Sequence, residues 1–126
     1  MKLSNRQIGA VGVARVAGAL FRCGYNVLTP MEDFAGYDLV AEKNGKFKRI
    51  QVKTTSRTET DKTCYRFMTA GGCDKKNAYT KYKIDVLVAW AMDEDLFWAF
   101  VPKQVKSPTK KLHPKTGSSW RVLSDI

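Results

Sequence analysis

The stretch YDLVAEKNGKFKRIQVKTT, residues 37–55, constrains the fold most strongly because two strand-like segments flank a tight-turn dipeptide. Asn44 and Gly45 at its centre both tolerate positive φ, which the two-residue turn of a β-hairpin requires. We therefore predict a hairpin whose strands span residues 37–41 and 47–54. Each of these strands carries polar side chains where a sheet is expected to bury apolar ones.

Asp38 is the polar residue that a solvent-facing surface does not explain. Side chains alternate along a strand, so Arg49, Gln51 and Lys53 share one face, and exposed polar alternation is common on antiparallel strands. Aspartate, in contrast, is depleted in strands, and a carboxylate among apolar neighbours is costly to bury unless a cation or a metal pairs with it. The hairpin brings Asp38 near Gln51 and Lys53, so we predict a functional site there.

These residue types suit the hydrolysis of a phosphodiester bond. The Asp38 carboxylate and the Gln51 amide oxygen can bind a divalent metal, and the backbone carbonyl of Val52 can complete the protein ligands. Lys53 can stabilise the attacking hydroxide or the negative charge that develops at phosphorus. We therefore predict Asp38, Gln51 and Lys53 as catalytic residues. A histidine nuclease or a Ser or Cys triad is not supported, because the only histidine, His113, lies in a Pro- and Lys-rich segment.

At these residues the chain resembles the PD-(D/E)XK nucleases, especially the group I intron homing endonucleases that carry Gln in place of the usual acid. The resemblance covers residues 1–55, through GYNVLTP and the hairpin, and continues more loosely through YKIDVLVAW and FWAFVP. It implies that Asp38 is the metal-binding aspartate, Gln51 the (D/E) position and Lys53 the motif lysine. It also implies a sequence-specific enzyme with Mg²⁺ as cofactor, which Mn²⁺ can replace.

One position departs from the family pattern. These nucleases usually carry a metal-site Glu on the first helix, and the matching position here is Val13, with no acid anywhere in residues 1–31. Since Gln51 is neutral, Asp38 is the only protein carboxylate expected at the ion, and phosphate oxygens would supply the remaining negative charge. A non-catalytic DNA-binding protein on this scaffold therefore stays open as an alternative. So does a nuclease resembling Holliday junction resolvases, which share the layout.

The chain is long enough for one domain, residues 1–126, and its 44% hydrophobic residues can build one core. Ser4 and Gln7 form a capping-box pattern that predicts a helix to Cys23. The element order predicts a restriction-endonuclease-like α/β fold, with a central mixed β-sheet flanked by helices. Besides the hairpin, we predict a short helix at residues 74–82 and strands at residues 25–28, 65–69, 84–92, 96–101 and 120–123.

A net charge of +10 indicates a polyanionic partner, and we predict double-stranded DNA. Residues 103–121 contain no acid, so within the basic C-terminal segment 103–126 we predict a basic loop there, before the strand at residues 120–123. A basic RNA-associated protein would instead need base-stacking aromatic residues on an exposed sheet face, which the sequence does not establish. The predicted phosphate contacts are Lys46, Lys48, Arg49, Arg57, Lys75, Lys76, Lys110 and Lys111.

Location and assembly follow from weaker patterns. The sequence has no apolar run of about 18 residues and no secretory signal pattern, so we expect a cytoplasmic protein without a membrane partner. The three cysteines have neither CxxC spacing nor histidine companions that would indicate zinc or a disulfide framework. Because one small domain covers only part of a long DNA site, we expect a homo-oligomer, a dimer or a tetramer.

Overall fold

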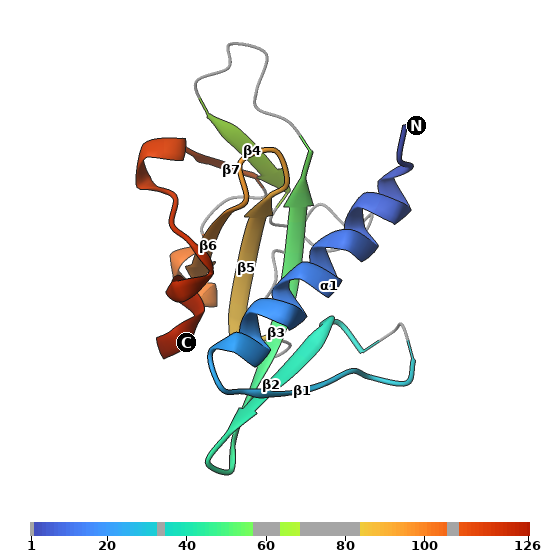
Figure 1. Ribbon diagram of the computed structural model, residues 1–126, viewed down its shortest axis with the longest axis vertical. Coiled ribbons are helices and arrows are strands. Elements are labelled where there is room, and N and C mark those ends of the chain that lie inside the picture. The colour runs from blue at the N-terminus through green and yellow to red at the C-terminus, as the bar shows by residue number, and fades with distance from the viewer. Residues whose placement is uncertain (1, 33–34, 57–63, 69–83, 106–108) are drawn as a thin grey trace.

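The computed structural model describes residues 2–32, 35–56, 64–68, 84–105 and 109–126, in which a long helix crosses one face of a β-sheet (Figure 1). The sheet has five strands in the order β1-β2-β3-β5-β6. β3 and β5 are parallel and the other neighbours are antiparallel, which confirms the predicted α/β fold with a mixed sheet. The strands are β1 (Asn26–Leu28), β2 (Leu39–Lys43), β3 (Lys46–Thr55), β5 (Val86–Ala91) and β6 (Leu96–Phe100).

The predicted hairpin is confirmed, with strand ends shifted by one or two residues. Asn44 and Gly45 connect β2 to β3 with φ values of 55° and 78°, as the two-residue turn requires. The register pairs Leu39 with Ile50 and Lys43 with Lys46. Asp38 is thus the residue immediately before β2 rather than a member of the strand.

The N-terminal helix α1 (Asn5–Arg22) begins with the predicted capping box. The Gln7 N–H donates to Ser4 Oγ at 3.2 Å, and the Ser4 N–H donates to Gln7 Oε1 at 2.8 Å. Gly12 is buried where α1 crosses β3, and a side chain there would overlap the Thr54 hydroxyl. The small residue at this position is therefore what lets the helix approach the sheet.

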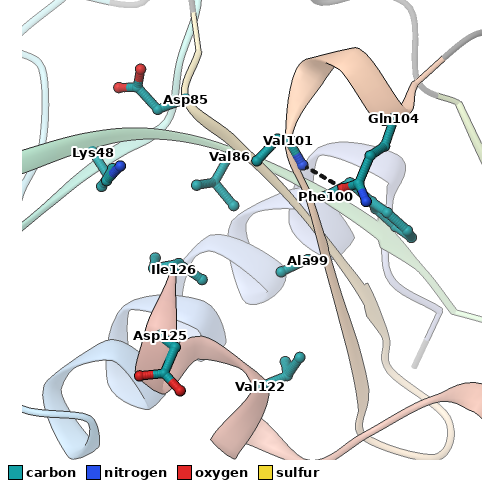
Figure 2. A pocket seen from close by; sticks show the side chains of 10 residues that line it. All are labelled: Lys48, Asp85, Val86, Ala99, Phe100, Val101, Gln104, Val122, Asp125 and Ile126. Atoms are coloured by element: carbon teal, nitrogen blue, oxygen red, sulfur yellow. Dashed lines mark hydrogen bonds between the residues drawn. The ribbon is translucent and has the colours of Figure 1, made fainter.

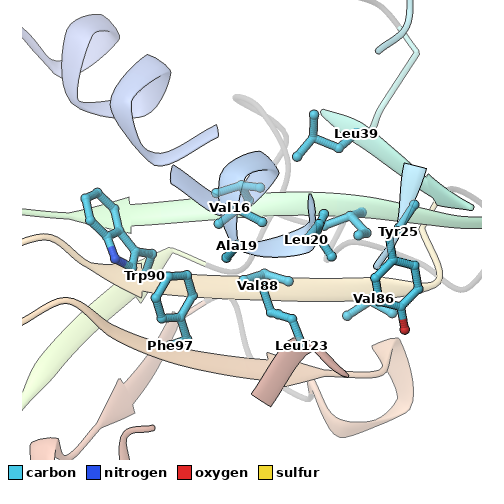
Figure 3. Close-up of a cluster of buried hydrophobic side chains, with 13 residues drawn as sticks. Val16, Ala19, Leu20, Tyr25, Leu39, Val86, Val88, Trp90, Phe97 and Leu123 are labelled. Carbon is cyan, nitrogen blue, oxygen red and sulfur yellow. The ribbon is translucent and has the colours of Figure 1, made fainter. Parts of the chain in front are cut away.

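The main core lies between α1 and the sheet (Figure 3). Val16 and Leu20 from the helix, Ile50 and Val88 from the central strands, and Leu123 from the C-terminal segment are all fully buried there. Because side chains alternate along β3, the burial of Ile50 and Val52 on this face directs Gln51 and Lys53 to the other face.

A salt bridge joins α1 to the turn between β5 and β6. The Arg15 guanidinium donates to the two carboxylate oxygens of Asp95 at 3.1 and 2.9 Å and lies 5.0 Å from the centre of the Phe97 ring. Asp95 also accepts the indole N–H of Trp90 at 2.6 Å. These contacts lower the pKa of Asp95, first through the Arg15 hydrogen bonds, and they fix the helix across the sheet.

A small two-stranded sheet packs on the other face of the main sheet. It pairs β4 (Tyr65–Met68) with β7 (Thr109–Leu112), and its aromatic side chains contact Ala89, Ala91 and Trp98. The prediction of a basic loop over residues 103–121 is therefore wrong at β7, where pairing with a distant strand imposes extended structure. The short helix predicted at residues 74–82 lies outside the described residues.

The strand predicted at residues 120–123 is also wrong. The chain there forms the 3₁₀-helix η3 (Trp120–Asp125), in which the Ser119 hydroxyl accepts the Arg121 N–H and Leu123 is buried in the main core. Only Ser118 pairs with β6, in an isolated bridge to Phe97, before the chain turns. Two further 3₁₀ turns are η1 (Pro102–Gln104) and η2 (Pro114–Thr116). Among the described residues, no helix is long and apolar enough to span a membrane.

We predict that Gly12→Ala destabilises the fold by about 1–3 kcal/mol, because the added methyl group overpacks the contact with Thr54. The control is Gly18→Ala, since a side chain at Gly18 meets no atom within 4 Å and should stabilise α1 by up to about 1 kcal/mol. Urea unfolding of both variants would measure the two effects. Equal stabilisation by both substitutions would show that α1 does not depend on close approach at Gly12.

Candidate active site

Asp38 is held against β3 by two hydrogen bonds. Its backbone N–H donates to the Ile50 carbonyl at 2.8 Å, and its carboxylate Oδ2 accepts the Val52 N–H at 2.8 Å. The side chain thus continues the β2–β3 hydrogen bonding past the first residue of β2. This arrangement explains how an aspartate is tolerated at the entrance to a buried strand.

Burial raises the pKa of Asp38 above its usual range, although the Val52 N–H bond and the positive charge of Lys53 partly oppose the rise. Among the described residues, the Val52 N–H and the charge of Lys53 therefore do not fully offset the burial of the ionised carboxylate. Within the described part of the chain, Oδ1 of this carboxylate accepts no hydrogen bond. The site favours an additional cation, and Lys53 is close enough to Asp38 to act on its charge.

Gln51 and Lys53 share the face of β3 that points away from α1, and both are partly buried. The Asp38 N–H bonds to the Ile50 carbonyl and its carboxylate to the Val52 N–H, so Asp38 lies beside this part of β3. The structure therefore brings Asp38 close enough to Lys53 to interact with it, and Gln51 shares the Lys53 face of β3. The N–H and carbonyl of a strand residue point toward the same neighbouring strand, so the Val52 carbonyl also points to the edge where Asp38 lies.

The oxygen atoms at this edge fit a hard divalent cation. A carboxylate, an amide oxygen and a backbone carbonyl, from Asp38, Gln51 and Val52, are ligands that Mg²⁺ accepts, whereas zinc prefers nitrogen and sulfur. The described residues contain no cluster of three or more His, Cys, Asp or Glu side chains that could hold a metal. With one carboxylate in the set, water and substrate phosphate would have to supply most of the remaining ligands.

Val13 is partly buried and packs against the main core. It belongs to α1, which contains no acidic residue along its whole length. The helix therefore offers an apolar side chain where the family pattern has a carboxylate.

Asp85 lies just before β5 and forms an ion pair with Arg49. Its carboxylate accepts the Arg49 backbone N–H at 2.8 Å and two guanidinium hydrogen bonds at 3.2 and 3.3 Å. Burial alone would raise the pKa of Asp85, but the hydrogen bonds and charge of Arg49 together hold it below its usual value. Asp85 is therefore engaged in an ion pair rather than in the candidate site.

The predicted phosphate contacts fall into two described groups. Lys46, Lys48 and Arg49 lie on the hairpin, whereas Lys110 and Lys111 lie on β7, where the Lys110 ammonium is 4.7 Å from the centre of the Phe100 ring. Arg57, Lys75 and Lys76 lie outside the described residues. The role of all eight in binding DNA stays a prediction.

A pocket of about 260 Å³ lies beside β5, β6 and η3 (Figure 2). Apolar side chains such as Val86, Ala99 and Val122 line it, with Lys48, Asp85 and Asp125 near its edges. It contains none of the three predicted catalytic residues. The candidate site therefore lies outside this pocket.

Comparison with known proteins identifies a family by sequence and a similar fold by structure. A family profile described as PD-(D/E)XK endonuclease matches residues 3–119. Protein 5.3 of Escherichia phage T7 is 35% identical over 101 residues, covering 80% of this chain and 83% of that protein. The bacterial homing endonuclease I-Ssp6803I superimposes with a TM-score of 0.77 over 87% of this chain and 78% of its own, at 22% identity, which indicates a shared fold.

We predict that Asp38→Asn stabilises the fold by about 0.5–1 kcal/mol at neutral pH, as removal of a strained functional group often does. Asparagine keeps an oxygen for the Val52 N–H but removes the buried charge. Because burial raises the folded-state pKa above the unfolded value, the carboxylate destabilises the fold above that folded pKa. The stabilisation by Asp38→Asn should therefore disappear when the pH is below the unfolded-state aspartate pKa of about 4.

Asp85→Asn is the matched control, because the folded-state pKa of Asp85 is lowered. Its ion pair with Arg49 stabilises the fold above the unfolded-state pKa, and this contribution is lost as pH falls through the folded pKa. The variant should therefore be less stable than the wild type at neutral pH, and equally stable in acid. Thermal unfolding at both pH values measures both effects, and a destabilised Asp38→Asn protein at neutral pH would contradict the first prediction.

Proposed function

The chain belongs to the PD-(D/E)XK endonuclease family, and from that premise we propose that it hydrolyses DNA phosphodiester bonds with a divalent metal ion. The observation that carries the proposal is the Asp38 carboxylate, partly buried and held by the Val52 N–H beside Lys53. A sequence-specific enzyme of the homing-endonuclease type is the form we favour, since the similar fold of I-Ssp6803I belongs to a homing endonuclease.

The residues around Asp38 have separate roles in this proposal. Asp38, the Gln51 amide oxygen and the Val52 carbonyl would hold Mg²⁺, or Mn²⁺ in its place. The bound ion would supply an activated water and neutralise charge on the phosphate. Val52 fixes the Asp38 carboxylate through its N–H, so the ligand is oriented before substrate arrives.

Lys53 would act on the reacting phosphate itself. Its side chain projects from the same face of β3 as that of Gln51, and its positive charge interacts with the Asp38 carboxylate. An ammonium group at this place stabilises the negative charge that develops as water attacks phosphorus. Because the site is partly buried, this stabilisation is screened less than it would be in water.

The charge of the chain supports double-stranded DNA as the substrate. Lys46 and Lys48 lie on the hairpin that carries the candidate site, and the net charge of +10 attracts a polyanion. Contacts of this kind position the duplex without reading its sequence. Cutting both strands requires two sites, so we propose that the chain works as a homo-oligomer, at least a dimer.

We predict that wild-type protein cleaves plasmid DNA with Mg²⁺ or Mn²⁺ and not in EDTA. Lys53→Ala should reduce the cleavage rate by about 10²–10³-fold, because charge stabilisation in the transition state is lost. Asp38→Ala should abolish cleavage, and DNA binding should change far less in both proteins. Gel analysis of cleavage and fluorescence anisotropy of binding would measure the two properties separately.

The charge-matched control for Lys53→Ala is Lys2→Ala, an exposed lysine before α1 whose loss should leave cleavage unchanged. A four-way junction and an RNA duplex serve as further substrates. Selective cutting of the junction would replace the homing-type proposal with a resolvase-type one. Cleavage that survives Asp38→Ala would overturn the assignment of the site.

A non-catalytic DNA-binding protein is the second candidate, and the acid-free helix α1 favours it. We predict for this case tight DNA binding, no cuts with any metal, and recovery of metal-dependent cleavage in Val13→Glu. Glutamate would restore the acid that the family pattern has at this position. Val13→Gln is the control, because it adds a similar volume without charge, and cleavage by both variants would exclude a role for the carboxylate.

A further inference from the structure

Three lysines of the β2–β3 hairpin share the face of the sheet that carries the main core. Lys46 and Lys48 occupy the even-numbered positions of β3, as the buried Ile50 does, and Lys43 lies directly opposite Lys46. Because side chains alternate along a strand, these three project toward the side of α1, whereas Lys53 projects from the other face of β3. We call Lys43, Lys46 and Lys48 the hairpin lysines.

Placing the hairpin lysines together costs free energy in the ligand-free protein. Like charges directly opposite each other on antiparallel strands destabilise the pairing, and Lys43 and Lys46 are such a pair. Among the described residues, no carboxylate forms a salt bridge with any of the three ammonium groups. Lys43 instead lies over the Tyr25 ring, with its ammonium 4.0 Å from the ring centre. A bound anion would therefore relieve the repulsion between these lysines.

The hairpin lysines line a pocket of about 410 Å³ between the hairpin and the end of η3. The Tyr25 hydroxyl donates to the Ser124 carbonyl at 3.2 Å, which fixes the end of η3 beside β1. Among the described residues that line this pocket, Asp125 is the single acid against three lysines, so the lining is net positive. Such a pocket suits a phosphate group, which ammonium groups bind through charge-assisted hydrogen bonds.

This basic pocket continues into the apolar pocket of about 260 Å³ beside β5, β6 and η3 (Figure 2). The two pockets have Lys48, Asp125 and Ile126 in common. Together they reach the size of sites that bind small molecules, about 300–1,000 Å³. A ligand with its phosphate at the hairpin lysines can therefore place an apolar body in the second pocket. The apolar walls there include Val86, Ala99 and Val122.

Polar groups at the border of the apolar pocket favour a body that has polar edges. Gln104 and Asp125 line this pocket, whereas the carboxylate of Asp85, also at its border, is bonded to Arg49. A nucleobase has two apolar faces and a polar edge that can hydrogen-bond to an amide or a carboxylate. A hydrocarbon chain would cover these groups without replacing their hydrogen bonds to water, which is costly.

We propose that the joined pockets bind a nucleotide, with its phosphate on the hairpin lysines and its base against Val86, Ala99 and Val122. The site uses the opposite face of β3 from Lys53, so this proposal does not rest on the proposed nuclease function. Two sources can supply the ligand, a free deoxynucleoside monophosphate or a nucleotide within a DNA strand. Both offer the same phosphate and base chemistry to the site.

The test is isothermal titration calorimetry of the protein with deoxyadenosine monophosphate, inorganic phosphate and deoxyadenosine at constant ionic strength. EDTA is present, so no divalent metal can hold a phosphate at the candidate active site. Lys46→Gln and Lys48→Gln each remove one charge from the proposed nucleotide site. Lys2→Gln removes an exposed charge elsewhere, and Lys53→Gln reports binding at the candidate active site.

Wild type is expected to bind the nucleotide more tightly than phosphate or deoxyadenosine, because only the nucleotide occupies both pockets. Lys46→Gln and Lys48→Gln should each weaken nucleotide binding about tenfold, the effect of one hydrogen bond to a charged group. Lys2→Gln and Lys53→Gln should bind as wild type. Equal affinities for phosphate and nucleotide, or an equal loss in Lys2→Gln, would overturn the proposal. So would a loss confined to Lys53→Gln, which would place the nucleotide at the candidate active site.

Competition with DNA identifies the source of the nucleotide. If a single DNA strand with a terminal phosphate displaces deoxyadenosine monophosphate from the wild type, the site accepts a nucleotide within a strand. If it does not, the site takes the free nucleotide. The cleavage assay with Asp38→Ala judges the nuclease function separately, so a failure of either proposal leaves the other standing.

Discussion

The register of the β2–β3 hairpin determines where every group of the candidate site lies. Because side chains alternate with a period of two, a slip of one residue would turn Ile50 and Val52 outward and bury Gln51 and Lys53 against α1. Asn44 and Gly45 allow only a short turn, and the apolar face must meet the helix. Two independent requirements thus select the same register, and the position of Asp38 beside Ile50 and Val52 follows from it.

The sequence predicted those parts of the fold that depend on interactions between residues close together in the chain. The capping box at Ser4, the Asn44-Gly45 turn and the apolar run of β5 each act within a few residues. The pairing of β4 with β7 and the 3₁₀-helix η3 depend on partners distant in the chain, so neither has a local signature. A short segment such as residues 120–123 takes whichever structure buries Leu123, and its composition alone does not determine that choice.

The sequence predicted which residues the hairpin carries to the candidate site but not the contacts that they make. The sequence indicated that Asp38 meets Gln51 and Lys53, because a hairpin leaves little freedom. It did not indicate that the carboxylate accepts the Val52 N–H, or that Arg49 holds Asp85, because both depend on where strands begin.

Because β5 pairs in parallel with β3, the contacts of the molecule can form in two stages during folding. α1, β1, β2 and β3 follow one another in the chain, and their mutual contacts close short loops. Pairing of β5 with β3 must close the long connection from residue 56 to residue 85. Closing this loop costs more conformational entropy than closing the short loops of the N-terminal part, so the pairing forms more slowly. Asp38, Gln51 and Lys53 all belong to the N-terminal part, so the candidate site can assemble before the second half of the sheet docks. Weakening β5 or β6 would then mainly speed unfolding rather than slow folding.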